Sequence, residues 1–88
     1  MPEVTLTIRN QVGLHARPAA LFVQTAQQFP CDIRVRHGSR EANAKSILSV
    51  LTLGAGQGAV VTIRTEGERA EEALAALQAL IAAFQGEA

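Results

Sequence analysis

The 88-residue chain is 48% hydrophobic and 18% charged with a formal net charge of zero, a composition typical of globular and not of disordered proteins. This length supports one small domain with a single core, which we expect to span residues 1–88. Residues 1–64 carry seven Lys/Arg against three Asp/Glu, but this excess is too dilute for a nucleic-acid-binding protein, so no nucleic-acid partner is expected.

Residues 1–4 have neither the basic leader nor the apolar run of a signal peptide, and no stretch approaches the length of a membrane span. We therefore expect a cytoplasmic protein without membrane partners.

The N-terminal stretch predicts a strand. Apolar residues at positions 4, 6 and 8 alternate with polar residues at 5, 7 and 9, the period-2 pattern of a strand with one solvent-exposed face.

The segment Gly-Leu-His-Ala-Arg-Pro-Ala at 13–19 predicts a helix start. Gly13 allows a tight turn before the helix, and Pro18 fits a first helical turn because it has no N–H to leave unpaired. These features place the helix start near Ala16, with His15 at its mouth. A residue before proline avoids the α region, however, so Arg17 leaves a later start at Pro18 open.

The residue types at this helix start indicate a phosphate site. Imidazole is a nucleophile near neutral pH and can carry a phosphoryl group through a P–N bond. Arg17 offers a planar cationic fork, and the free N–H groups of Ala16 and Arg17 would face an anion at the positive end of the helix dipole. The alternative is a plain helix-entry histidine beside a solvated arginine. We favour the phosphate site, with His15 and Arg17 as its functional side chains.

The first predicted helix is followed by a hairpin. Helical spacing gives the helix a core stripe at 19, 22, 23 and 26, with Arg17, Gln24 and Gln27 on its outer face. Cys31 is the only cysteine; it is interpreted as a semi-buried filler that suits a reducing compartment. A second strand over 32–36 and a third over 40–43 are joined by a turn at 38–39. We expect His37 to take an exposed or cross-strand polar role, with no metal ligation.

The next predicted helix carries more apolar surface than a surface helix needs. Ser46 can cap its start and Gly54 can end it. Val50 lies toward one side, while Ile47, Leu48 and Leu51 spread over another. We interpret this surplus as a partner-binding patch; the alternative is a helix that is more deeply buried.

The remainder of the chain predicts a loop, a strand and a long helix. Glycines at 54, 56 and 58 lack the Lys-Ser/Thr of a phosphate-binding P-loop and are interpreted as a flexible loop. A fourth strand follows over 60–64. Acidic residues at 68, 71 and 72 favour a helix start there. The core stripe of this last helix contains Ala70, Ala73, Leu74, Leu77, Ile81 and Phe84. The element order is βαββαβα, the order of an α+β fold.

The 13–19 segment, together with Asn-Ala-Lys-Ser-Ile at 43–47 and Leu-Gly at 53–54, resembles the HPr family over nearly the whole chain. This family contains the histidine phosphocarrier proteins of the phosphoenolpyruvate-dependent sugar phosphotransferase system. The resemblance implies an open-faced β-sandwich, with a four-stranded antiparallel sheet in the order 1-4-2-3 covered on one face by three helices. A ferredoxin-like strand order remains the alternative.

The resemblance also implies a function. His15 would be phosphorylated on its pros nitrogen by enzyme I and would donate to enzyme II A components, with Arg17 binding the phosphate. Ser46 matches the serine modified by a regulatory kinase, so an HPr kinase/phosphorylase is a further candidate partner. A docking surface is implied at Ala20, Gln24, Gln27, Ile47, Leu48 and Leu51. The protein would be a monomeric co-substrate without a cofactor or metal, and not an enzyme.

Three functional classes are weighed as alternatives to the phosphoryl carrier. Gln24, Gln27 and Ser49 stand where many family members have lysine or glycine, which leaves a nitrogen-branch or regulatory relative open. An RNA-binding sheet is disfavoured, because the chain has no Tyr or Trp and its three Phe residues fall on or beside predicted helices. A hydrolase is disfavoured because no carboxylate or second base accompanies His15 in its motif. The phosphoryl carrier is the leading interpretation.

Overall fold

The computed structural model describes residues 2–9, 13–14 and 16–84. These residues form the predicted order of elements. The four strands and three helices of the described residues follow in this order: β1 (Glu3–Thr7), α1 (Ala16–Ala26), β2 (Asp32–His37), β3 (Arg40–Asn43), α2 (Ile47–Leu51), β4 (Val60–Glu66) and α3 (Ala70–Phe84). The βαββαβα prediction is therefore confirmed.

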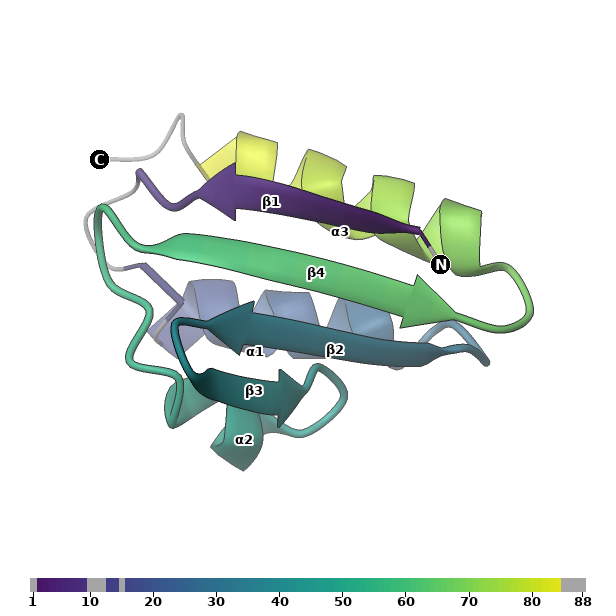
Figure 1. Cartoon of the computed structure of the whole chain (residues 1–88), viewed down its shortest axis with the longest axis horizontal. Helices are drawn as coiled ribbons and strands as arrows, with labels where there is room; N and C mark the ends of the chain where they lie inside the picture. Colours follow the sequence, from purple (N-terminus) through teal and green to yellow (C-terminus); the bar gives the residue numbers. More distant parts are fainter. Residues whose placement is uncertain (1, 10–12, 15, 85–88) are drawn as a thin grey trace.

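The strands form one four-stranded sheet in the order β1-β4-β2-β3, with each neighbouring pair antiparallel. Figure 1 shows β4 between the first two strands of the sequence. The central register places Ile63 of β4 opposite both Val4 of β1 and Val35 of β2. This order confirms the predicted open-faced sandwich and rules out the ferredoxin-like alternative.

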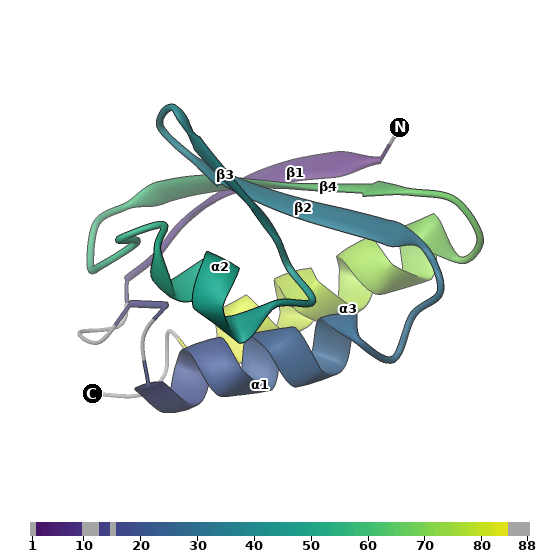
Figure 2. The same ribbon diagram turned by 90° about the horizontal axis from the view of Figure 1, so that it is seen from below.

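The helices lie on one face of the sheet, and the other face is open (Figure 2). Because side chains alternate along a strand, each strand sends one set toward the helices and the other toward solvent. The open face is polar in the described chain: Thr5 and Thr62 share a hydroxyl contact of 3.0 Å, and arginines 34, 36 and 64 line a shallow hollow there. It lacks the aromatic platform that RNA-binding sheets use.

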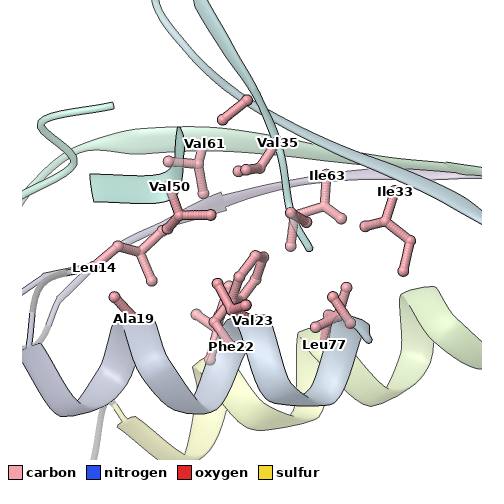
Figure 3. Close-up of a cluster of buried hydrophobic side chains, with 14 of the residues drawn as sticks. Leu14, Ala19, Phe22, Val23, Ile33, Val35, Val50, Val61, Ile63 and Leu77 are labelled. Carbon is pink, nitrogen blue, oxygen red and sulfur yellow. The ribbon is translucent and has the colours of Figure 1, made fainter. Parts of the chain in front are cut away.

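The core fills the space between the sheet and the helices (Figure 3). Alternate strand residues contribute Ile33, Val35, Val61 and Ile63, all fully buried. Phe22 from α1 and the apolar stripe of α3 pack against these strand residues. In the α3 stripe, Leu74 is half-buried and the following residues are buried: Ala73, Leu77, Ile81 and Phe84. Cys31 is 2% exposed, so it is more deeply buried than the sequence predicted.

Two helix boundaries differ from the prediction. Helix α2 ends at Leu51 with Thr52 as its C-cap, so Gly54, with a φ of +64°, lies beyond the helix and does not end it. Helix α3 begins at Ala70, after Arg69 in a left-handed conformation with a φ of 62°. Glu68 consequently precedes the helix, and only the acids at 71 and 72 lie in its first turn, where negative charge is favourable.

In the part of the chain that the structure describes, no helix combines the length and apolar character needed to cross a membrane. The same residues contain no group of three or more His, Cys, Asp or Glu side chains arranged to hold a metal ion.

Candidate functional site

The segment that leads into α1 is held by a backbone contact with a distant loop. The Leu14 N–H donates to the Ala55 carbonyl oxygen at 2.7 Å, and the Leu14 side chain is fully buried. Gly13 has a φ of +67°, and a Cβ added there would stand 2.4 Å from Ala55 O and 2.5 Å from Gly56 Cα. Gly13 is therefore required both for the left-handed turn and for the close approach of two backbones.

Helix α1 starts at Ala16, where the sequence predicted, and Arg17 is helical despite the proline that follows it. Pro18 and Ala19 are buried and attach the first turn to the core. The first N–H groups of a helix have no intrahelical acceptor, so those of Ala16 and Arg17 belong to the positive end of the α1 dipole. The backbone part of the predicted phosphate cradle thus coincides with the observed helix start.

His15 lies outside the described residues, so its predicted role as the phosphoryl acceptor stays a prediction. Its sequence neighbours are both placed: Leu14 is buried in the core, and Ala16 is the first residue of α1.

Arg17 is exposed in the first turn of α1. Within the described ranges, the ion pairs join Asp32 to Arg34 at 3.3 Å and Arg69 to Glu72 at 3.0 Å. The Arg17 guanidinium is in neither of these pairs. An exposed guanidinium can bind an anion through its planar donor fork.

The loop after α2 was predicted as flexible, and the structure instead ties it to two other segments. Gly58 N–H donates to Ile8 O at 2.6 Å, and Ile8 N–H donates to Ala59 O at 2.8 Å. The Gln57 side chain adds a bond from Nε2 to Arg9 O at 3.1 Å. The same loop contacts the Gly13–Leu14 segment through the Ala55 carbonyl. The sequence signal for it was the repeated glycine, which often marks close backbone approach.

The apolar surplus on α2 is at the surface. Ile47, Leu48 and Leu51 are 39%, 74% and 37% exposed, whereas Val50 is fully buried. The alternative of a deeply buried helix is therefore wrong. Ser46 is the N-cap, as predicted, and its Oγ accepts a long hydrogen bond of 3.4 Å from the Ser49 N–H.

The other predicted docking residues lie on α1 or directly after it, and α1 packs beside α2 (Figure 2). Ala20 is half-buried, and Gln24 and Gln27 are exposed. The Gln27 Nε2 donates to Lys45 O at 3.0 Å, so this side chain also has an internal role that sequence reasoning missed. The two helices thus present the predicted docking residues on neighbouring elements.

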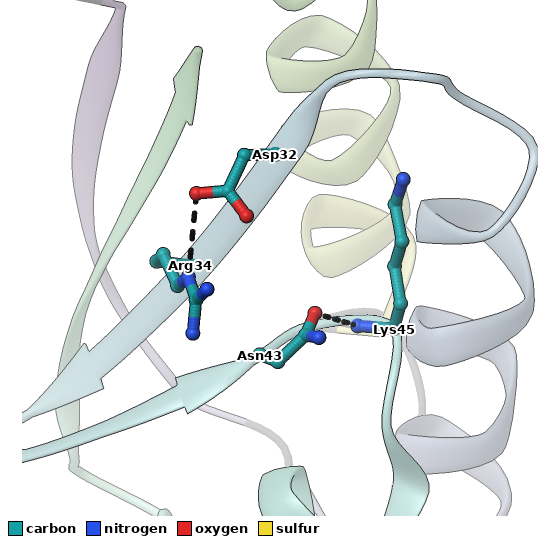
Figure 4. Close-up of polar contacts among 4 residues, drawn as sticks. All are labelled: Asp32, Arg34, Asn43 and Lys45. Carbon is teal, nitrogen blue, oxygen red and sulfur yellow. Dashed lines mark hydrogen bonds and ion pairs between the residues drawn. The ribbon is translucent and has the colours of Figure 1, made fainter.

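Lys45 connects the same region to the end of α1. Its backbone N–H donates to Asn43 Oδ1 at 3.0 Å (Figure 4). Its Nζ donates to Phe29 O at 2.6 Å. The ammonium group is therefore engaged within the chain. It contributes to holding the segment before α2 against the loop after α1.

His37 is the residue whose environment differs most from the prediction. It is half-buried, and its Nδ1 lies 2.8 Å from Leu53 O, which follows α2. Its partner is thus neither solvent nor a facing strand. The neighbouring Arg40 donates from Nη1 to Thr52 O at 2.8 Å.

In a comparison with protein-family models, the model described as "PTS HPr component phosphorylation site" matches residues 2–83 of this chain. Among curated proteins, the phosphocarrier protein HPr of Pseudomonas aeruginosa is 48% identical over 82 residues, covering 92% of this chain and 91% of that protein. The HPr-like protein Crh of Halalkalibacterium halodurans is 42% identical over 81 residues, covering 92% and 96%.

Solved structures show the same fold. The structure of HPr-C-His from Thermoanaerobacter tengcongensis aligns with a TM-score of 0.95 at 51% identity, covering 100% of this chain and 99% of that one. A structure of an HPr dimer from the same organism aligns with a TM-score of 0.79 at 52% identity, covering 99% and 100%. The dimer is a property of that protein and leaves the monomer expected for this chain untested.

Proposed function

The chain belongs to the HPr family of phosphocarrier proteins of the phosphotransferase system, and we propose that its carrier residue is His15. The pros nitrogen accepts a phosphoryl group from phosphorylated enzyme I and passes it to sugar-specific enzyme II A components. The observation that carries the assignment is the exposed Arg17 in the first turn of α1, two residues after the histidine, which is in neither ion pair of the described residues.

The chemistry of each transfer is a displacement at phosphorus. The lone pair of the His15 pros nitrogen forms the new N–P bond while the bond between phosphorus and the donor breaks. Negative charge gathers on the phosphoryl oxygens during this step. Arg17 and the N–H groups of Ala16 and Arg17 would stabilise that charge, because fixed donors need no reorganisation as charge develops. The protein is consumed and regenerated as a co-substrate, without a cofactor.

Docking uses the surface of α1 and α2. The exposed apolar side chains of α2 supply the contact area, and Ala20, Gln24 and Gln27 extend it along α1. An apolar centre with a polar rim is the usual composition of a transient protein interface. The partners follow from the family: enzyme I, enzyme II A components and, at Ser46, an HPr kinase/phosphorylase.

Ser46 is the proposed regulatory site. A phosphate on its Oγ would meet the N–H groups at the start of α2, where negative charge is favourable. The same dianion would stand beside Ile47 and Leu48, at the edge of the docking surface. Phosphorylation would thus leave the fold intact and impair partner binding.

A regulatory relative is the second candidate, since the HPr-like protein Crh is 42% identical to this chain. Gln24, Gln27 and Ser49 leave a nitrogen-branch relative open as well, because they replace residues common at partner-facing positions of the family. The presence of His15 argues against a purely regulatory role. Transfer assays with sugar-branch and nitrogen-branch partners separate the two candidates.

Three further properties complete the proposal. We place the protein in the cytoplasm, treat residues 1–88 as a single domain, and expect a monomer. Size-exclusion chromatography with light scattering, compared before and after phosphorylation, checks the oligomeric state.

The test is incubation with phosphoenolpyruvate and enzyme I, followed by intact-mass measurement. One phosphoryl group should be added, and it should be labile in acid and stable in base. His15→Ala should abolish the adduct while keeping the wild-type melting temperature. Normal labelling of His15→Ala would contradict the proposal.

A further inference from the structure

Two polar side chains of the β2–β3 hairpin reach the backbone that follows α2. His37 and Arg40 face each other across the hairpin, His37 in alternation with the buried Val35 and Arg40 with the buried Ala42. They therefore occupy the helix-covered face of the sheet, where the strand pattern favours apolar residues. Their presence there is explained by their partners, the carbonyl oxygens of Leu53 and Thr52, each at 2.8 Å.

Both contacts are donations from the hairpin to the two residues that follow α2, the C-cap Thr52 and the next residue, Leu53. A carbonyl oxygen can only accept, so His37 Nδ1 carries the hydrogen in this arrangement. The last carbonyls of a helix lack intrahelical donors, and cationic donors near a helix C-terminus are favourable. Arg40 thus satisfies the carbonyl of the C-cap, and His37 bonds the carbonyl of the residue after it, so both donors hold the backbone at the C-terminal side of α2.

Helix α2 depends on such external contacts because it has five residues, and isolated helices of this length are not stable in water. Its N-terminal side is held by the Ser46 cap and by the Gln27 bond to Lys45 O. Buried Val50 attaches its inner side to the core. The hairpin contacts complete this support at the C-terminal side.

We propose that His37 and Arg40 are positioning residues for the docking surface of α2. They act through the helix, holding its backbone so that Ile47, Leu48 and Leu51 are presented in one arrangement. A preordered surface loses less conformational entropy on binding, and so binds its partner more tightly. This inference rests on the proposed function, since it assigns a consequence for docking to phosphorylated enzyme I.

The test compares variants that differ only in the donor. Asn places its Nδ2 where His places Nδ1, whereas Leu has a similar size and no donor, so His37→Asn and His37→Leu form a matched pair. Arg40→Met removes the second donor. Arg36→Met, on the exposed face of β2, removes the same charge without touching α2 and serves as the control.

Amide hydrogen exchange and transfer kinetics are measured on each variant, with β4 amides as the reference for an intact fold. Loss of one neutral hydrogen bond should speed exchange at Val50, Thr52 and Leu53 by about fivefold in His37→Leu. His37→Asn should exchange like the wild type. The KM for phosphorylated enzyme I should rise in His37→Leu, by at most this factor, because a smaller fraction of the molecules presents the ordered helix, and kcat should be unchanged.

The outcomes separate the inference from the proposed function. Equal exchange in the Leu and Asn variants, or equal effects of Arg36→Met and Arg40→Met, would overturn the inference. Faster exchange at α2 with an unchanged KM would overturn the docking role alone. A wild-type protein that takes up no phosphoryl group would contradict the proposed function, whatever the exchange rates show.

Discussion

Replacement of Leu48 by aspartate tests whether the apolar side chains of α2 form a docking surface. Leu48 is 74% exposed in the folded protein. Its removal therefore costs only about a quarter of the free energy of burying a whole leucine side chain, which is less than about 1 kcal/mol. An aspartate at the second position of the helix also gains about 0.3–1 kcal/mol from the dipole. The two effects nearly cancel, and the free energy of unfolding should stay close to that of the wild type.

Val50→Asp is the matched comparison, because it places the same charge on the same helix at a fully buried position. Burial of an unpaired carboxylate should lower the free energy of unfolding by at least about 3 kcal/mol. Thermal melts of the two variants should therefore differ clearly.

The functional half of this prediction concerns enzyme I. If Leu48 lies in the interface, its replacement by a charge should weaken binding by about 1–2 kcal/mol, or roughly tenfold in KM. Steady-state transfer from phosphorylated enzyme I measures this change. If the melting temperature of Leu48→Asp is as low as that of Val50→Asp, Leu48 is not at the surface. An unchanged KM would show that Leu48 does not belong to the docking surface.

Three other variants test the site. Arg17→Ala should raise the activation free energy of phosphoryl transfer by about 2–4 kcal/mol without lowering the melting temperature. Transfer at the wild-type rate would contradict the role of Arg17 in phosphate binding. Gly13→Ala should destabilise the fold by about 2–4 kcal/mol through its contact with the Ala55 carbonyl, more than Gly54→Ala, where a Cβ meets open space. Ser46→Asp should keep the melting temperature and slow transfer from enzyme I; rates equal to those of Ser46→Ala would contradict the regulatory proposal.

The sequence predicted those features that a local pattern encodes. Alternating residues located the strands, helical spacing located the α3 stripe, and the Gly13–Pro18 motif located the start of α1, because each depends on neighbours within a few positions. The sheet order came instead from the family resemblance, since strand pairing joins residues far apart in the chain.

The features that were missed depend on long-range backbone contacts. The Ala55 carbonyl receives the Leu14 N–H across 41 positions, and the Leu53 carbonyl receives His37 Nδ1 across 16. A carbonyl is present in every residue, so no side-chain pattern marks the ones that act as acceptors. The loop after α2 was consequently predicted as flexible, and His37 as an exposed or cross-strand polar residue. The polar residues at positions 37 and 40 fall on the helix-covered face of the hairpin, and this was the one sequence feature that could have indicated these contacts.

The most direct test of the central proposal is NMR of the phosphorylated protein with ¹⁵N-labelled histidine. The ¹⁵N signal of an imidazole nitrogen changes and couples to phosphorus when that nitrogen is phosphorylated. The spectrum therefore identifies both the residue and the ring nitrogen that bears phosphorus. The proposal predicts phosphorus coupling at the pros nitrogen of His15, no change in His37, and loss of the signal when an unphosphorylated enzyme II A component is added. Coupling at His37, or a phosphoryl group bound through oxygen, would contradict the assignment of His15 as the carrier.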